Sequence, residues 1–322
     1  MFCIDMHCDT MVRGINKPLR DSDLCATLEK LKKGNSMAQF FAFYIPKGIM
    51  NRKSPNGTPL LDQYNKLLNK FRREMDENSD IVAQARTPDE ILANHQKGLI
   101  SAVISLEDAF VIQTLDRLDK FYADGVRCTG ITWNFENHLA YPNSSDPQLM
   151  AKGLKPFGFD VVEKCNQLGI AIDVSHLSDG GFYDVARHSK KPFIATHSNA
   201  RALANHPRNL TDDMLKILGE KGGITGLNFC DRFLSTKESE DGVRIAYIDD
   251  MVRHAIHITN VAGIDALGLG SDFDGISNQV EFENWLGMPR LLDALRKHFT
   301  ESQLEKICHK NALRVLRDIQ SV

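Results

Sequence analysis

Residues 171–176 read Ala-Ile-Asp-Val-Ser-His, and residues 193–197 read Phe-Ile-Ala-Thr-His. Each is a short apolar run that ends in a histidine, and such runs are typical of buried strands in a parallel sheet. The C-terminal ends of such strands carry the active sites of α/β barrels. We therefore expect His176 and His197 to face the same end of a barrel. Taken singly, either residue could equally be a hydrogen-bonded core or loop histidine.

Eight strands of this kind alternate with helical segments along the chain. The predicted strands lie at 2–9, 36–45, 99–106, 125–132, 171–176, 193–197, 223–229 and 266–271. Strands that alternate with helices form parallel sheets with right-handed crossovers, and eight of them can close into a barrel. We predict the α/β class and a TIM-type (β/α)8 barrel that forms a single domain over residues 1–322. A flavodoxin-like or Rossmann sheet is the alternative.

Composition and charge exclude several classes of function. The 322-residue chain carries 39 Lys and Arg against 42 Asp and Glu, a net charge of −3, so nothing favours nucleic acid or a membrane as a partner. The seven cysteines form no CxxC pair, which favours free thiols in a reducing compartment, and we expect a cytoplasmic location. No window is apolar enough to span a bilayer. A signal peptide is not expected, because candidate functional residues begin at His7.

Side chains that bind metals lie at or just after the ends of five predicted strands. His7 and Asp9 are two residues apart, so they point to the same side of an extended chain. Glu107 and Asp108 follow the third strand, and for Asp108 the alternative interpretation is an acid that favours a helix N-terminus. The full set comprises three histidines and three carboxylates, namely His7, Asp9, Glu107, His176, His197 and Asp272.

This set of ligands predicts a binuclear metal centre. Imidazole and carboxylate together suit Zn²⁺, with Mn²⁺ or Co²⁺ as alternatives. A single catalytic zinc typically uses three protein ligands, and structural zinc sites favour cysteine. Two ions that share one carboxylate and a hydroxide would use all six side chains. We therefore expect two zinc ions per chain in a hydrolase.

The chain resembles the membrane (renal) dipeptidase family of amidohydrolase-like metal-dependent barrels. The matching segments occur in the family's order and at its intervals, and they are Asp-Met-His-Cys-Asp-Thr at 5–10, Gly-Leu-Lys-Pro-Phe-Gly at 153–158, Asp-Val-Ser-His at 173–176, Thr-His-Ser at 196–198, Pro-Arg-Asn at 207–209 and Gly-Ser-Asp-Phe-Asp-Gly at 270–275. The resemblance implies that His7, Asp9 and Asp272 bind one zinc. It also implies that His176 and His197 bind the other and that Glu107 bridges the two.

The resemblance also implies how substrate is bound. Arg208 would bind the C-terminal carboxylate of a dipeptide, a role that suits a planar bidentate guanidinium, and a D-residue at that end would be tolerated. The chain departs from the family where vertebrate members have a histidine, because Trp133 follows Thr132 here. His138, five residues on, is a candidate substitute. Asp108 and Ala109 also replace the usual Gly-Gly, and we expect both departures to affect substrate preference and not metal binding.

We predict a zinc-dependent dipeptidase that cleaves short peptides with a free C-terminus by a metal-bridging hydroxide. Asp272 would accept the proton of the attacking water and pass it to the leaving amine, with Glu107 as the bridge. The alternatives are another binuclear amidohydrolase, which acts on an N-acyl amino acid, cyclic amide or lactone, and a non-catalytic metal-binding barrel. A homodimer is what the resemblance implies. The segments expected over the mouth are 46–59, 141–155, 230–244 and 275–287.

Overall fold

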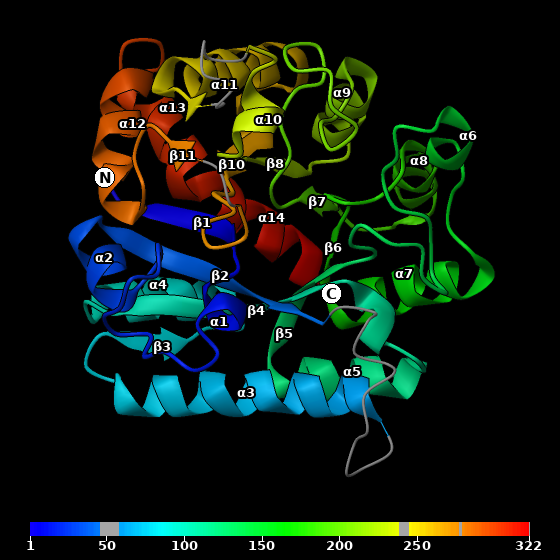
Figure 1. Cartoon of the computed structure of the whole chain (residues 1–322), viewed down its shortest axis with the longest axis horizontal. Helices are drawn as coiled ribbons and strands as arrows, with labels where there is room; N and C mark the ends of the chain where they lie inside the picture. The colour runs from blue at the N-terminus through cyan, green and yellow to red at the C-terminus, as the bar shows by residue number, and fades with distance from the viewer. Residues whose placement is uncertain (46–57, 238–244, 277–278, 322) are drawn as a thin grey trace.

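A closed parallel barrel organises the chain. The structure is a computed structural model that describes residues 1–45, 58–237, 245–276 and 279–321. The barrel strands are β1 (Cys3–Cys8), β2 (Ser36–Tyr44), β4 (Ile100–Glu107), β5 (Val126–Gly130), β6 (Ala171–Asp173), β7 (Ile194–Ala195), β8 (Ile224–Leu227) and β10 (Leu267–Leu269). They follow the order β2-β1-β10-β8-β7-β6-β5-β4, and a β2–β4 pairing closes the ring (Figure 1). The predicted α/β TIM-type barrel is confirmed.

The barrel is closed by seams of unequal length. The β2–β4 seam is continuous from Ala38 opposite Ser101 to Tyr44 opposite Glu107, which brings Tyr44 level with Glu107 at the C-terminal edge. The β1–β10 seam has one residue pair in register, Asp5 opposite Leu269. Closure of the barrel between β1 and β10 therefore depends on contacts other than the hydrogen bonds of the β-ladder.

Longer helices surround the strands, as the apolar periodicity predicts. They are α3 (Pro59–Glu77), α4 (Pro88–Gln96), α5 (Leu115–Asp124), α7 (Pro156–Leu168), α8 (Asp179–His188), α9 (Asp212–Glu220), α11 (Ile248–Ala262) and α12 (Met288–Leu295). Shorter helices are α1 (Thr10–Arg13), α2 (Leu28–Lys33), α6 (Pro147–Met150) and α10 (Asp231–Leu234). Among the described residues, no helix has both the length and the apolar character that a bilayer crossing requires.

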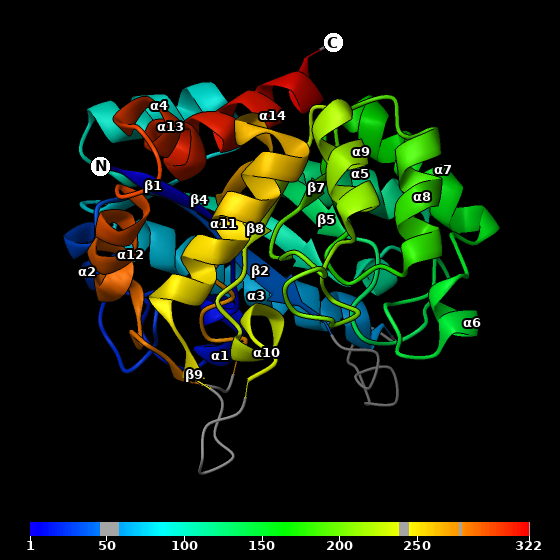
Figure 2. The ribbon, with the colours of Figure 1, turned by 90° about the horizontal axis from the view of Figure 1, so that it is seen from above.

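The C-terminal segment closes the bottom of the barrel. It consists of α13 (Glu301–Glu305), a π-helical turn (Lys306–Lys310) and α14 (Asn311–Gln320). Apolar side chains of α14 cluster with strand residues such as Ile4 and Ile224. Figure 2 shows α14 at the end opposite α1 and α10, so the site must open at the other end.

Three short strands were not predicted. β3 (Val82–Gln84) pairs with the start of β4, and β9 (Ile245–Ala246) pairs in parallel with β11 (Gln279–Val280). Helix α11 begins at Ile248, shortly after β9. Two- and three-residue strands are too short to give an alternating pattern. Of the segments expected over the mouth, 46–57, 238–244 and 277–278 lie outside the described residues.

Candidate metal centre

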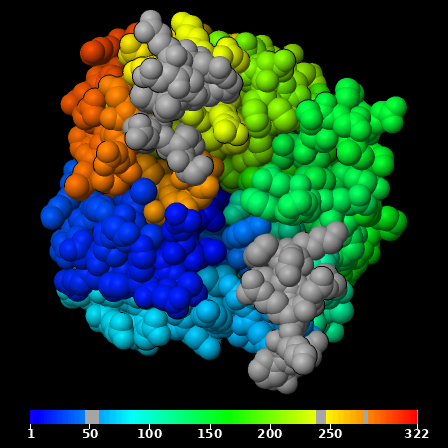
Figure 3. Space-filling view, viewed as in Figure 1, coloured from blue at the N-terminus to red at the C-terminus, as the bar shows by residue number. Residues whose placement is uncertain are grey.

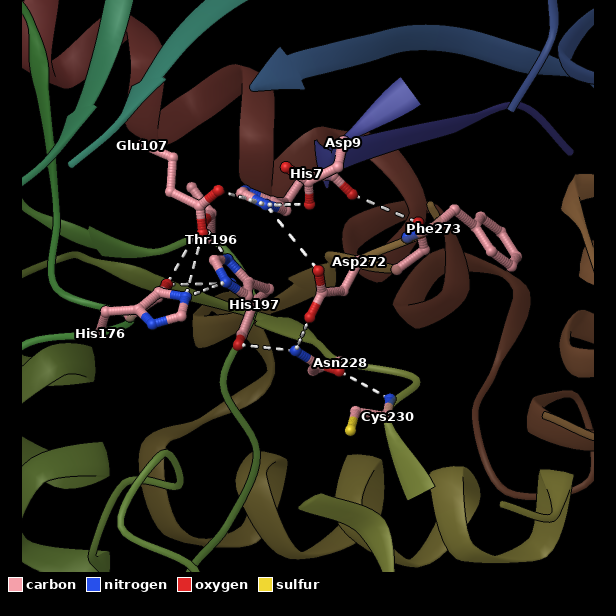
Figure 4. Close-up of polar contacts among 12 residues, drawn as sticks. His7, Asp9, Glu107, His176, Thr196, His197, Asn228, Cys230, Asp272 and Phe273 are labelled. Carbon is pink, nitrogen blue, oxygen red and sulfur yellow. Dashed lines mark hydrogen bonds and ion pairs between the residues drawn. The ribbon is translucent and has the colours of Figure 1, made fainter. Parts of the chain in front are cut away.

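The strand ends bring the predicted metal ligands together at one end of the barrel. His7 lies in β1, and its Nε2 is 3.4 Å from Asp9 Oδ2 and 3.9 Å from Asp272 Oδ1. His176 and His197 follow β6 and β7, and their Nε2 atoms lie 3.0 Å apart. Figure 4 shows these side chains converging from opposite sides of the mouth.

Glu107 lies between the two halves of this cluster. Its Oε1 is 3.1 Å from His176 Nε2, and its Oε2 is 3.9 Å from His7 Nε2. Two groups of donor atoms, each within 4.8 Å of one another, share this residue: one with His7 and Asp9, the other with His176 and His197. A carboxylate with one oxygen on each side has the geometry of a bridge between two cations.

The ionisation of the cluster reflects burial among like charges. Burial raises the pKa of Glu107 well above its usual range, and the Asp9 carboxylate adds to this. Burial also raises the pKa of Asp272, to about 6. At His7 burial lowers the pKa, but Glu107 and the other carboxylates outweigh it and raise the pKa to about 10. Three clustered carboxylates therefore favour an added positive charge.

The other two histidines stay neutral. Burial lowers the pKa of His176 well below its ordinary value, and the Arg208 guanidinium lowers it further. Burial likewise lowers the pKa of His197, and the nearby His7 adds to the shift. Neutral imidazole is the form that binds a metal ion.

Several features fit the cluster to divalent ions. His7 Nε2 is buried and has no hydrogen-bond partner among the described residues. Gly275 leaves space that a side chain would fill, because a Cβ there would lie 2.1 Å from Asp9 Oδ2 and 2.5 Å from Asp272 Oδ1. Imidazole nitrogens with carboxylate oxygens are the donors that zinc accepts in catalytic sites. The residues present therefore suit a binuclear divalent centre.

Hydrogen bonds beneath the cluster hold its residues in place. Asp5 Oδ1 accepts the Ser271 N–H at 2.8 Å and its Oδ2 accepts the Ser271 hydroxyl at 2.6 Å, directly before Asp272. Asn228 Nδ2 donates to Asp272 Oδ2 at 3.0 Å. Sequence reasoning did not single out Asp5 or Asn228. Asn228 does follow β8, so the same strand-end rule that located the ligands could have found it.

A cavity of about 590 Å³ opens above the cluster. Its lining includes Asp9, Glu107, His176 and Asp272, and also Arg208, Trp133, Tyr44, Asn143, Arg232 and Ile276. Three of the four segments expected over the mouth thus contribute to it. On the face shown in Figure 3, N-terminal, central and C-terminal parts of the chain meet.

Arg208 and Trp133, the two side chains for which a substrate contact is predicted, both line the cavity. Arg208 is buried, donates from Nη1 to the Ser175 carbonyl, and lies with Nη2 3.1 Å from His176 Nε2. Trp133 packs on Tyr44, with ring centroids 4.7 Å apart. The cavity therefore has a cationic wall and an aromatic wall.

His138 is not placed with the other candidates. It is absent from the cavity lining, and its Nε2 contacts the Ile112 carbonyl at 2.8 Å while its ring stacks on Phe157. The suggestion that it substitutes for the missing histidine is therefore not supported by its position. Asp108, beside Glu107, accepts from Phe110 N–H and Asn137 Nδ2 and has a φ of 68°, so it shapes the turn that follows β4.

Comparisons with known proteins agree with this geometry. The profile of the family described as membrane dipeptidase (peptidase family M19) matches residues 1–322. An uncharacterized dipeptidase of Schizosaccharomyces pombe is 31% identical over 304 residues, which are 92% of this chain and 72% of that protein. A solved metallopeptidase of Rhodobacter sphaeroides, liganded with a phosphinate mimic of the dipeptide L-Ala-D-Ala, is 29% identical with a TM-score of 0.85 over 99% of both chains. The solved dipeptidase AC of family M19 is 29% identical with a TM-score of 0.86 over the same share.

Proposed function

Since the chain belongs to the membrane dipeptidase family, peptidase family M19, and is thus a metal-dependent dipeptidase, we propose that it works with two zinc ions per chain. Six side chains would hold the ions. His7, Asp9 and Asp272 would bind one, and His176 and His197 the other. The observation that carries this assignment is that Glu107 belongs to two groups of donor atoms, one with His7 and Asp9 and one with His176 and His197. Mn²⁺ and Co²⁺ accept the same donors and are the alternative metals.

The chain's own residues would divide the work of peptide hydrolysis. When bound, two zinc ions would supply a hydroxide near neutral pH and polarise the scissile carbonyl. Asp272 would take the proton of the attacking water and deliver it to the leaving amine. Its Oδ2 accepts the hydrogen bond from Asn228, and its Oδ1 lies on the His7 side of the site.

Arg208 would select substrates with a free C-terminus. Its guanidinium is anchored on the Ser175 carbonyl and Ser198 Oγ, so it is held at the cavity wall before substrate arrives. A preorganised guanidinium pairs well with a carboxylate. The L-Ala-D-Ala mimic bound by the Rhodobacter relative supports the proposal that a C-terminal D-residue is tolerated here too. Trp133, stacked on Tyr44, would contact a substrate side chain.

The test is hydrolysis of L-Ala-D-Ala by metal-stripped protein titrated with Zn²⁺. Activity should rise until two zinc ions are bound per chain and then level off. L-Ala-D-Ala amide, which lacks the carboxylate, should be a poor substrate for the wild type. Arg208→Lys should raise KM for the free dipeptide by a larger factor than it lowers kcat. A plateau at one zinc ion would contradict the binuclear assignment.

The alternative substrates are distinguished in the same assay. Cleavage of N-acetyl-Ala-D-Ala or of a lactone in preference to the free dipeptide would favour another binuclear amidohydrolase. Zinc binding without turnover of any of these compounds would favour a metal-binding barrel without catalysis. A cytoplasmic location and a homodimer stay predictions.

A further inference from the structure

We propose that Asp173 and Thr196 are positioning residues that hold His197 in the tautomer whose Nε2 is free to bind a metal ion. Neither residue would touch substrate. The inference rests on the metal site of the proposed function, but it concerns how the chain prepares that site before an ion arrives. Thr196 and its contact with the cluster are visible in Figure 4.

Asp173 accepts hydrogen bonds on both of its oxygens at the end of β6. Oδ1 accepts the backbone N–H groups of Ser175 and Thr196, each at 2.9 Å, and the Ser175 hydroxyl at 2.5 Å. Oδ2 accepts the Thr196 hydroxyl at 2.5 Å. Four donors thus converge on the two oxygens of Asp173, and the single hydroxyl proton of Thr196 points at Oδ2.

The direction of the hydrogen bond from Thr196 to Asp173 determines how Thr196 contacts His197. Thr196 Oγ1 lies 2.7 Å from His197 Nδ1. Because the hydroxyl proton is already donated to Asp173, Oγ1 must accept at this contact, and Nδ1 must carry the proton. A neutral imidazole has one proton, so Nε2 is left as a lone pair. The Thr196 hydroxyl thus links the Asp173 carboxylate to the His197 ring. Metal-binding histidines commonly have such a hydrogen-bond partner on the ring nitrogen that does not bind the metal, and it fixes their tautomer.

The lone pair points into the cluster. His197 Nε2 lies 3.0 Å from His176 Nε2 and shares a group of donor atoms with Glu107. His176 Nδ1 contacts Asn134 Oδ1 at 2.9 Å, an acceptor, so His176 also keeps its proton on Nδ1. His176 Nε2 therefore also carries a lone pair, which accepts from Arg208 Nη2 at 3.1 Å, and a bound cation would take the lone pairs of both Nε2 atoms.

Three variants separate this relay from a general packing role. Thr196→Ser keeps the hydroxyl, whereas Thr196→Val removes it at nearly constant volume. Asp173→Asn should invert the relay: two backbone N–H groups require an oxygen at the Oδ1 position, so the amide nitrogen must face Thr196. Thr196 would then donate to His197 Nδ1, and the ring proton would move to Nε2, where it blocks the metal.

Zinc affinity of the metal-stripped variants, measured by competition with a chromophoric chelator, gives the first readout. The zinc affinity of Thr196→Ser should stay within about 3-fold of wild type. In Thr196→Val the affinity of the site that contains His197 should fall about 10–100-fold. The second readout is the ¹⁵N chemical shifts of His197 in metal-free protein. They should report a proton on Nδ1 in wild type and on Nε2 in Asp173→Asn.

Asp5→Asn is the matched control. It removes another buried carboxylate beside the cluster. Its hydroxyl partner Ser271 has a second acceptor, the His7 carbonyl at 3.3 Å, and the residue after Ser271 is not a histidine. The His197 tautomer should therefore not change. Wild-type zinc affinity in Thr196→Val, or a proton on Nε2 in the wild type, would overturn the relay. If Asp173→Asn does not fold, the Thr196 pair decides. Failure to cleave dipeptides would affect the proposed substrate and leave both readouts intact.

Discussion

Two buried histidines, His7 at the barrel mouth and His254 on the outer helix α11, use their ring nitrogens differently. His254 Nδ1 accepts the Ala200 N–H at 3.1 Å, and its Nε2 contacts the Leu234 carbonyl at 3.0 Å. His7 Nε2 has no hydrogen-bond partner among the described residues and faces carboxylates. Burial lowers the pKa of His254 to about 4, whereas at His7 the carboxylates outweigh burial and raise the pKa to about 10.

The contrast separates a histidine that stabilises the fold from one that serves the site. The region around His254 satisfies its polar groups within the protein, so it needs nothing added. The mouth collects carboxylates, and His7 Nε2 there has no hydrogen-bond partner in the part of the chain that the structure describes, so a bound cation would complete it. Changes at the mouth should therefore alter function more than stability, and changes around His254 should do the reverse.

The largest effect should follow from Glu107→Ala. Loss of the shared carboxylate should lower kcat/KM about 10³-fold or more, which is about 4 kcal/mol of transition-state stabilisation. The metal-free variant should be at least as stable as wild type, because burial beside Asp9 raises the pKa of Glu107 and makes its charge unfavourable. Initial rates and urea unfolding measure the two parts. Near-wild-type turnover would refute the bridging role, and the exposed Glu163→Ala is the control.

Zinc should stabilise the mouth and leave the His254 region unchanged. At a free zinc concentration 1,000 times Kd, binding to one site should add about 4 kcal/mol to the free energy of unfolding. Thermal unfolding of chelator-treated protein, with and without zinc, measures the gain. Glu107→Ala should lose most of it, whereas His254→Gln should keep all of it. An equal gain in both variants would mean that zinc binds elsewhere.

His254→Ala should destabilise the protein by about 3 kcal/mol with little change in kcat. The substitution leaves the Ala200 N–H and the Leu234 carbonyl without their partner and creates a cavity in the shell. Denaturant unfolding gives the loss, and active-site titration gives turnover per folded molecule. His254→Gln, which can still bond to one of the two groups, should lose less. A large fall in kcat would contradict the proposal that His254 stabilises the fold without serving the site.

Acid should weaken the fold through His254 by a smaller amount. Its pKa is near 4 when folded because of burial, and about 6.5 when unfolded. The unfolded state therefore takes up the proton first as the pH falls. The stabilisation is complete above pH 6.5 and is lost towards pH 4, which amounts to about 2 kcal/mol between pH 7 and pH 5. In His254→Gln the pH dependence over this range should be flatter by that amount.

The barrel could be predicted because its strands are apolar runs that end in polar residues. Strands buried on both faces are apolar over most of their length, as in 100–107 and 171–173. The expectation that polar residues at the ends of such strands face the barrel mouth located all six candidate ligands. β3, β9 and β11 could not be predicted, because pairing of two or three residues depends on where the neighbouring strand lies. The π-helical turn before α14 was likewise invisible, since it preserves the apolar face of the helix.

The site beyond its ligands depends on tertiary contacts that spacing does not encode. Sequence spacing placed His138 near the mouth, whereas the turn after β5 directs it towards Phe157. Nothing in the sequence separates His254, on a helix, from a ligand except the absence of a strand before it. The link from Asp173 through Thr196 to His197 joins β6 to β7, so it exists only once those strands are neighbours.

The single register pair between β1 and β10, reinforced by Asp5 and Ser271, has a consequence for biosynthesis. The candidate ligands are contributed from residue 7 to residue 272, so a nascent chain that has not yet released β10 from the ribosome lacks part of the coordination sphere. Capture of the ion assigned to His7, Asp9 and Asp272 would therefore wait until the ring has closed. A folding intermediate with an open β1 edge would bind that ion weakly, whereas Glu107, His176 and His197 all precede β10.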